Sequence, residues 1–244
     1  SMTINNTTFL ANTADKSGGA VANSGTLESD NTTFENNTAT ESGGAVFNAG
    51  SYSADTDTFE GNTAETDGGA IYNQGTLESR GSTFTTNTAT ESGGAVFNAG
   101  SYSTDTDTFN ENLADSGGAI YNQGTLNSRD STFISNTSSE SGGAVFNANG
   151  AIYSAYNNTF EKNTAETDGG AIYNAGSVFF EGETNFTENS ANNGGAIYNQ
   201  GVISSSDIET YTKNSATYNG GAVDWNASSG TLTDCIFEYN TADY

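Results

Sequence analysis

The carboxylates are the side chains whose number and spacing could support chemistry. The chain has 30 Asp and Glu residues against five Lys and Arg, no His and one Cys. Two carboxylates can act as the acid and base of a glycosidase when they lie at a defined separation. Here the acids recur at regular spacing in predicted turns, as in Glu41, Asp67, Glu91, Glu140 and Asp168. Recurrence produces a ladder of similar groups and not one unique pair, so the sequence favours a non-catalytic protein.

The clearest candidate for metal binding is Asp55-Thr56-Asp57, which recurs as Asp105-Thr106-Asp107. Alternating carboxylates could supply the oxygen ligands that Ca²⁺ requires. The motif lacks the glycine-rich nonapeptide of calcium-binding β-helix repeats, so we expect solvated turn acids and keep these four Asp as weak candidates. The chain has one cysteine, Cys235, and no histidine, which excludes a zinc cluster. We expect no cofactor.

A column of aromatic residues is the candidate for ligand binding. If the aliphatic residue before each ring points inward, the alternation of a strand directs the ring outward. An exposed apolar stripe usually marks a partner or ligand surface. The opposite phase, with the rings in the core, is the alternative. We call this set the aromatic stripe, and its members are Phe47, Tyr72, Phe97, Tyr121, Phe146, Tyr173 and Tyr198.

The elements that must position these residues follow from an internal repeat. The phrase Gly-Gly-Ala-(Ile/Val) begins at nine glycines, with spacings between 24 and 27 residues: Gly18, Gly43, Gly68, Gly93, Gly117, Gly142, Gly169, Gly194 and Gly220. A second phrase, Phe-x-x-Asn, keeps step with it from Phe9 to Phe237. A fixed period of this size indicates a solenoid whose units contact only their neighbours.

Each period contains three short runs of strand-forming residues separated by Gly, Asn and Asp. The sequence therefore predicts an all-β protein, a single right-handed parallel β-helix of about ten coils of about 25 residues, with three short strands per coil. Three interior columns are expected: the aliphatic residue after Gly-Gly-Ala, the Phe of Phe-x-x-Asn, and a middle column that runs from Leu27 through Tyr52 and Ile152 to Leu232. Two Asn columns should form hydrogen-bonded ladders along the rod.

The charge and composition limit the classes of function that this sequence can support. A net charge of −25 should repel nucleic acid and anionic membranes. No apolar run approaches the ~18 residues needed to cross a bilayer. A column of Thr after the repeated Asn could order water, which leaves an ice-binding solenoid as one alternative. A polysaccharide-active enzyme is the other, because parallel β-helices host such activities.

The two phrases together, as in Gly68-Gly69-Ala70-Ile71 and Phe84-Thr85-Thr86-Asn87, resemble the repeats of the chlamydial polymorphic membrane proteins and related adhesin-like surface proteins. This resemblance implies a secreted, cell-surface adhesin that binds a protein or glycan of a host or neighbouring cell. We expect residues 1–244 to form one domain, a fragment of a longer array, with Ser1-Met2 as a remnant of cloning. Unpaired strands at both ends make end-to-end self-association plausible.

Overall fold

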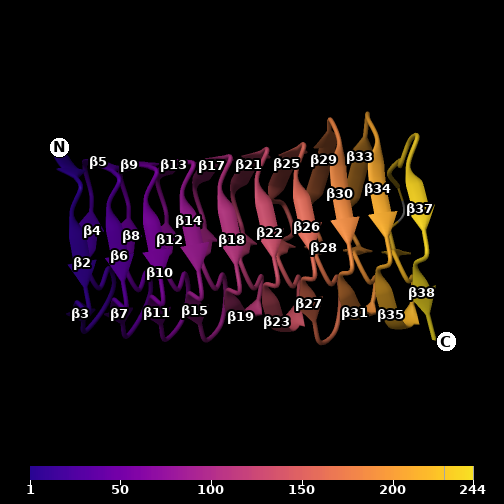
Figure 1. Ribbon diagram of the computed structural model, residues 1–244, viewed down its shortest axis with the longest axis horizontal. Helices are drawn as coiled ribbons and strands as arrows, with labels where there is room; N and C mark the ends of the chain where they lie inside the picture. The colour runs from indigo at the N-terminus through magenta and orange to yellow at the C-terminus, as the bar shows by residue number, and fades with distance from the viewer. Residues whose placement is uncertain (228, 244) are drawn as a thin grey trace.

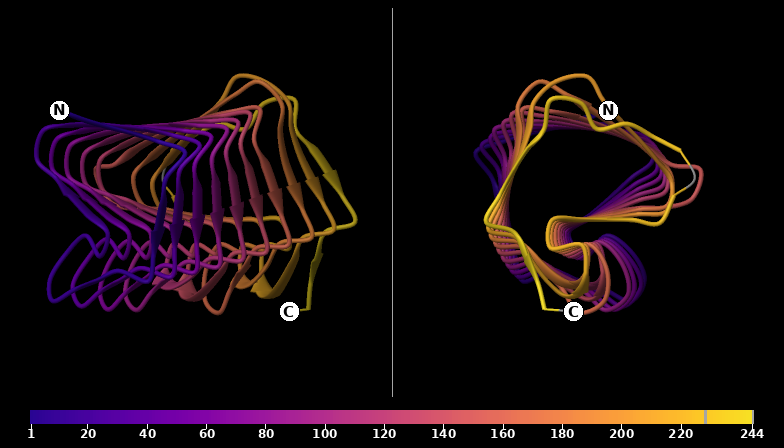
Figure 2. Two further views of the ribbon diagram at one scale, coloured as in Figure 1. Left: turned by 60° about the vertical axis from the view of Figure 1, so that its left-hand side comes forward. Right: turned by 90° about the vertical axis from the view of Figure 1, so that its right-hand side faces the viewer.

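Each period of the sequence forms one coil of a parallel β-solenoid (Figure 1). The computed structural model describes residues 1–227 and 229–243, and every strand pairing in this part of the chain is parallel and joins equivalent residues of successive coils. Viewed down the axis, each coil consists of a large loop and a smaller loop below it (Figure 2). The strands stack into four sheets, which we call sheets A to D.

Sheet A carries the middle column and lies at the top of Figure 1. Its strands are β1 (Met2–Asn5), β5 (Thr26–Asp30), β9 (Ser51–Asp55), β13 (Thr76–Arg80), β17 (Ser101–Asp105), β21 (Thr125–Arg129), β25 (Ile152–Tyr156), β29 (Ser177–Glu181) and β33 (Val202–Ser205). Sheet B carries the Phe column. Its strands are β2 (Thr8–Leu10), β6 (Thr33–Glu35), β10 (Thr58–Glu60), β14 (Thr83–Thr85), β18 (Thr108–Asn110), β22 (Thr132–Ile134), β26 (Thr159–Glu161), β30 (Thr184–Thr187), β34 (Glu209–Thr212) and β37 (Ile236–Glu238).

Sheet C forms part of the smaller loop, at the bottom of Figure 1. Its strands are β3 (Thr13–Ala14), β7 (Thr38–Ala39), β11 (Thr63–Ala64), β15 (Thr88–Ala89), β19 (Leu113–Ser116), β23 (Thr137–Ser141), β27 (Thr164–Ala165), β31 (Ser190–Asn193), β35 (Ser215–Asn219) and β38 (Thr241–Ala242). Sheet D follows each Gly-Gly-Ala turn. Its strands are β4 (Val21–Asn23), β8 (Val46–Asn48), β12 (Ile71–Asn73), β16 (Val96–Asn98), β20 (Ile120–Asn122), β24 (Val145–Asn147), β28 (Ile172–Asn174), β32 (Ile197–Asn199) and β36 (Val223–Trp225).

The prediction of three strands per coil is therefore wrong, because a coil has four. The expected third strand, Ser82-Thr83-Phe84, corresponds to β14, and the fourth strand, β15, lies in the segment expected to be a turn. The two strands are separated at the residue before the Asn of Phe-x-x-Asn. That residue has a left-handed backbone, with φ of 54° at Asn36 and 55° at Lys162. A positive φ cannot continue a strand. Sheets B and C are therefore separate, and they meet at a corner.

The double glycine is required by close packing of the backbone. The second glycine of each pair lies against the next coil, so that a Cβ built on Gly69 would be 2.1 Å from the carbonyl oxygen of Gly94. The first glycine has a positive φ, 64° at Gly68. Only glycine adopts this conformation and this approach without strain.

The core fills the large loop with the three predicted columns. The aliphatic column is buried from Val46 to Ile197, and the Phe column from Phe34 to Phe186. Successive Phe rings stack in parallel, as Phe59 and Phe84 do with centroids 4.7 Å apart. The prediction of Ile152 as a member of the middle column is wrong. Ile152 is 43% exposed, and Tyr153 occupies its place opposite Leu126. The turn before this strand holds two extra residues, because Asn122 pairs with Asn147 whereas Thr125 pairs with Ile152.

Both Asn ladders are present. In one ladder, each side-chain amide donates to the Oδ1 of the next coil, as Asn62 Nδ2 does to Asn87 Oδ1 at 2.9 Å, and that same Oδ1 accepts the Asn62 main-chain N–H. The other ladder links Asn48 Nδ2 to Asn73 Oδ1 at 2.7 Å. These amides satisfy buried turn groups. Within the described residues, no helix is long and apolar enough to cross a membrane.

Candidate functional site

The aromatic stripe lies on the face of sheet D that is turned away from the core. In β12, Ile71 and Asn73 are buried while Tyr72 between them is partly exposed, and the same pattern holds for Phe47, Tyr121, Phe146 and Tyr173. Phe97 and Tyr198 are more covered, at 5% and 8% exposure. The rings therefore point outward, as the alternation of side chains along a strand predicts.

The seven rings form one continuous stack along the rod. Neighbouring centroids lie between 4.5 Å (Phe146 and Tyr173) and 5.5 Å (Phe47 and Tyr72) apart, and the ring planes are within 15° of parallel. Each internal ring thus has both faces covered by its neighbours. A ligand can reach only ring edges and hydroxyls, except at the ends of the stack.

The ends of the stack differ chemically. The residue paired with Phe47 in the first coil is the exposed Ala22, so one face of the Phe47 ring has no aromatic neighbour. At the other end Tyr198 pairs with Asp224. There Gln200 joins two rings, because its Oε1 accepts from the Tyr173 hydroxyl at 2.9 Å and its Nε2 donates to the Tyr198 hydroxyl at 3.3 Å.

The stripe borders the smaller loop, which carries negative charge. Burial raises the pKa of Tyr121 and of Tyr173, and the nearby carboxylates of Asp67 and Asp168 act in the same direction. Tyr121 and Tyr173 are therefore neutral hydroxyl donors at physiological pH. The stripe offers apolar edges and hydroxyls beside a row of acids.

The four aspartates considered for Ca²⁺ binding do not point toward one common position. Asp57 and Asp107 are each 1% exposed and point into the core. Asp55 and Asp105 are partly exposed and lie on the outer face of sheet A. In the described part of the chain, no group of three or more His, Cys, Asp or Glu side chains is arranged to hold a metal ion. The expectation that these Asp are solvated turn acids is wrong for Asp57 and Asp107.

The buried aspartates belong to an internal polar network that sequence reasoning missed. Asp107 accepts hydrogen bonds from Ser79 Oγ, from Thr104 Oγ1 at 2.7 Å and from the Ser82 main-chain N–H at 2.7 Å. Ser79 Oγ also contacts the Tyr102 hydroxyl at 3.0 Å. Asp57 repeats this arrangement two coils earlier, with Ser29 and Tyr52. Desolvation raises the pKa of each aspartate to about 6.

The network explains the alternation of Leu and Tyr in the middle column. A tyrosine hydroxyl in the core needs a partner. In each coil with a Tyr in the middle column, the hydroxyl contacts the Ser that lies two residues after the Leu of the preceding coil. An Asp or Asn five residues after the Tyr completes the set. The third set is Ser128, Tyr153 and Asn158. The recurring five-residue offset from Tyr to Asp was the available signal.

Comparison with protein families identifies one repeat type. The family model described as the Chlamydia polymorphic membrane protein (Chlamydia_PMP) repeat matches residues 31–49, 58–74, 81–99, 108–123, 130–148, 159–175 and 183–200. These segments, together 125 of the 244 residues, each run from the Phe-x-x-Asn phrase to the Asn of the following sheet D strand. Comparisons with curated proteins and with solved structures found no match.

Proposed function

The chain belongs to the Chlamydia polymorphic membrane protein repeat family, and on this basis we propose that it is a non-catalytic adhesin rod presented at a cell surface. Its role is to bind a protein or glycan on a host or neighbouring cell. The family consists of surface proteins of the passenger type, and a solenoid of ten coils suits projection from a surface.

The aromatic stripe is the observation that carries the proposal. It is a continuous, partly exposed row of seven stacked rings on a polar, acidic rod. Aromatic residues dominate the energetics of protein interfaces because they bury much area at low entropic cost. Since the faces are covered, the partner makes edge contacts and hydrogen bonds to hydroxyls, and it extends along the rod.

The repetition of the interior argues for a scaffold role. The buried carboxylates Asp57 and Asp107 are enclosed and hydrogen-bonded. The exposed acids recur from coil to coil. A catalytic role would require unlike groups gathered around one substrate position.

The test is cell binding by a fluorescently labelled rod. The triple variant Tyr72→Ser, Tyr121→Ser, Tyr173→Ser should lose at least about tenfold in apparent affinity. The comparison is the triple Tyr→Phe variant, which keeps the stack in the form already present at Phe97 and removes only the hydroxyls, so it should lose less affinity than the Ser variant. Equal binding by the Ser variant and the wild type, with both folded by circular dichroism, would refute the role of the stripe.

A further inference from the structure

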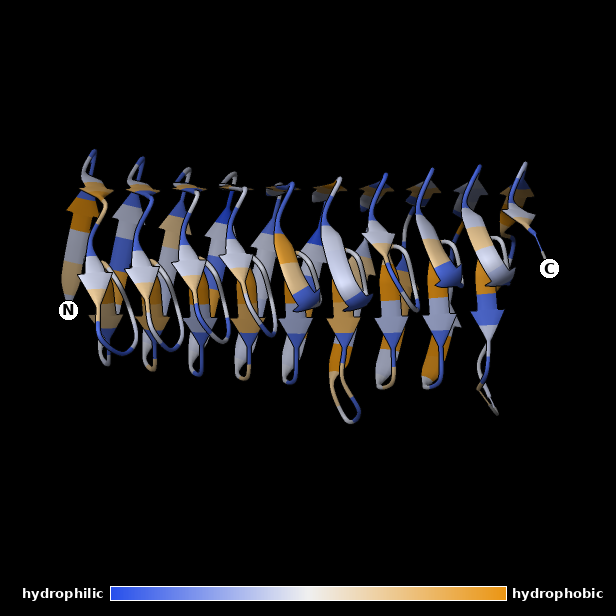
Figure 3. Ribbon diagram, turned by 90° about the horizontal axis from the view of Figure 1, so that it is seen from below, coloured by the Kyte–Doolittle hydropathy of each residue, from blue (hydrophilic) through white to orange (hydrophobic). Residues whose placement is uncertain are grey.

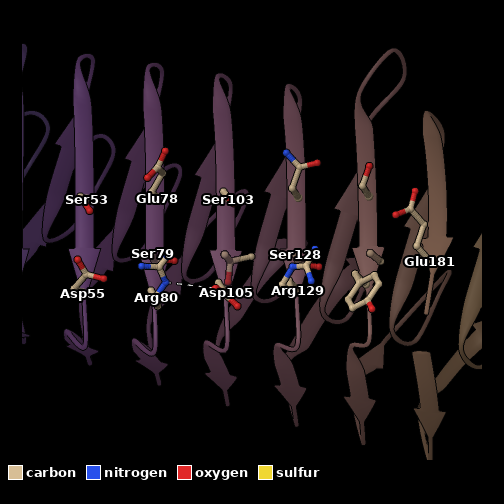
Figure 4. A pocket seen from close by; sticks show the side chains of 15 residues that line it. Ser53, Asp55, Glu78, Ser79, Arg80, Ser103, Asp105, Ser128, Arg129 and Glu181 are labelled. Carbon is tan, nitrogen blue, oxygen red and sulfur yellow. Dashed lines mark hydrogen bonds and ion pairs between the residues drawn. The ribbon is translucent and has the colours of Figure 1, made fainter. Parts of the chain in front are cut away.

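We propose that the outer face of sheet A holds a second binding site, a trough that takes a neutral oligosaccharide lying along the rod. The trough crosses β9, β13, β17, β21, β25 and β29 and encloses about 420 Å³ (Figure 4). Six strands at a spacing of ~4.8 Å give it a length of about 24 Å. It lies on a different sheet from the aromatic stripe.

The shape of the trough comes from alternating side-chain size. One outward column reads Ser53, Glu78, Ser103, Asn127 and Ser154 in register. Each serine lies between longer side chains, which leaves a depression above it. Stacking coils of two kinds thus produces a row of shallow pits and not a flat sheet.

The second outward column supplies most of the charge. It reads Asp55, Arg80, Asp105, Arg129, Tyr156 and Glu181. Its first four members lie near the lower ends of their strands in Figure 4. Both arginines of the chain are in this column. Arg80 Nε lies 3.4 Å from Asp105 Oδ2, and the Arg129 guanidinium lies 4.3 Å from the centroid of the Tyr156 ring.

The donors and acceptors of the trough match a polyol. Guanidinium and carboxylate groups alternate along the column, and each can form two parallel hydrogen bonds. Adjacent hydroxyls of a sugar both donate and accept, so one ligand can use Arg80, Asp105 and Arg129 in turn. The Tyr156 ring, one face of which lies against the Arg129 guanidinium, adds apolar surface beyond that contact for a sugar ring.

The charge of the side chains that line the trough favours a neutral ligand. Four carboxylates against two arginines line the trough, on a chain with a net charge of −25, so a polyanion is repelled. A protein partner is disfavoured because its interface would need a desolvated apolar centre. The trough is polar along most of its length, with Tyr156 as its aromatic member.

The arginines also reduce repulsion between the neighbouring aspartates, but this contribution to stability is small. The Arg80 side chain is 69% exposed, and ion pairs in contact with solvent add little to stability. Replacing the arginines should therefore leave the rod folded. Binding and folding can then be measured independently.

The experiment is calorimetric titration of the full chain with cellohexaose, xylohexaose, chitohexaose and, as an acidic comparator, hexagalacturonate. At least one neutral probe should bind, and the variants Arg80→Ala/Arg129→Ala and Tyr156→Ala should each weaken it at least about tenfold. Lys213→Ala and Tyr218→Ala, which remove an exposed cation and an exposed ring outside the trough, are the matched controls and should bind as the wild type does.

Three outcomes would overturn the proposal: no neutral probe binds at millimolar concentration, binding survives the Arg80→Ala/Arg129→Ala substitution, or hexagalacturonate binds more tightly than the neutral probes. The triple Tyr→Ser variant of the stripe separates the two sites. It should keep oligosaccharide binding even where cell binding is lost, so failure of one proposal is distinguishable from failure of the other.

Discussion

The main-chain N–H of Ser82 donates a hydrogen bond to the Asp107 carboxylate one coil later, with 2.7 Å between N and Oδ1, at a site where Asp107 is 1% exposed. Asp57 makes the equivalent bond with the N–H of Thr32 at 2.8 Å. The interior of this solenoid thus holds two equivalent carboxylates, Asp57 and Asp107, two coils apart. Their ionisation links the stability of the rod to pH.

Acidification should stabilise the rod. Burial raises the pKa of Asp57 and Asp107 to about 6, above the value each has in the unfolded chain. Their contribution is fully present below the unfolded pKa and is lost as pH rises to about 6. The loss is at most about 3 kcal/mol for each residue. Desolvation also raises the pKa of Glu209, which adds an effect of the same sign. Urea unfolding between pH 4 and pH 7 measures this.

The control is the double variant Asp57→Asn, Asp107→Asn. Asn158 shows that an amide fits this position, because its Oδ1 accepts from the Ser131 N–H at 3.0 Å and its Nδ2 donates to Ser128 Oγ at 2.6 Å. The variant should be more stable than the wild type at pH 7 and should have a flatter pH profile. An unchanged slope would show that the buried aspartates do not titrate in this range.

Replacing the second glycine of a pair should unfold the affected coils. A Cβ on Gly69 would lie 2.1 Å from the Gly94 oxygen and 2.6 Å from the Thr88 oxygen, both backbone atoms. Gly69→Ala should therefore cost about 4 kcal/mol or more, which thermal melting followed by circular dichroism would detect. The control is Gly25→Ala, since a Cβ there would meet nothing within 4 Å. Equal melting temperatures for the two variants would contradict the packing.

The Asn ladder should be costly to interrupt in the middle of the rod. Asn87→Ala removes the bonds from its side-chain amide to Asn112 Oδ1 and Phe59 O. It also leaves the Asn62 main-chain N–H without its acceptor and the Asn62 side-chain amide with Phe34 O alone. These groups are buried, so we expect a loss of about 3–5 kcal/mol in urea unfolding. Asn12→Ala, at the start of the ladder, should cost clearly less, because Asn12 joins only the following Asn37. A similar loss at both positions would argue against a ladder.

The aromatic stripe should accept one more ring. Ala22 is exposed and pairs with Phe47, whose ring face on that side has no aromatic neighbour. Ala22→Phe should extend the stack and raise stability by up to about 1 kcal/mol. Ala22→Leu is the control for added apolar area without a ring. A destabilised Ala22→Phe variant would show that the stack cannot be extended there.

Much of the fold was predictable because each column repeats the same residue type. Val46, Phe34 and Asn37 mark columns that recur in nearly every coil. The corner between sheets B and C was not predictable, because its left-handed residue is Thr86 in one coil and Lys162 in another, with no consistent glycine. Tyr153 was missed because an insertion beside Gly150 changes the register locally.

The candidate sites were predictable only in part. Strand alternation predicts that the rings of the aromatic stripe point outward. That neighbouring rings cover each other's faces depends on the distance between the stacked rings. Asp57 was misassigned because the sequence shows an acid in a turn but not that Ser29 of the preceding coil and Tyr52 of the same coil enclose it. The trough also arises only when residues 25 apart, such as Arg80 and Asp105, are placed side by side.

The central claim is that equivalent residues of successive coils lie one strand spacing apart, and a spin-label distance tests it most directly. Labels at Ser53→Cys and Ser154→Cys, in a Cys235→Ser background, lie on β9 and β25, four spacings apart. The account predicts a narrow distribution near the ~19 Å Cα separation that four spacings give, widened only by the label arms. A broad distribution centred near the ~55 Å of a random coil would contradict it.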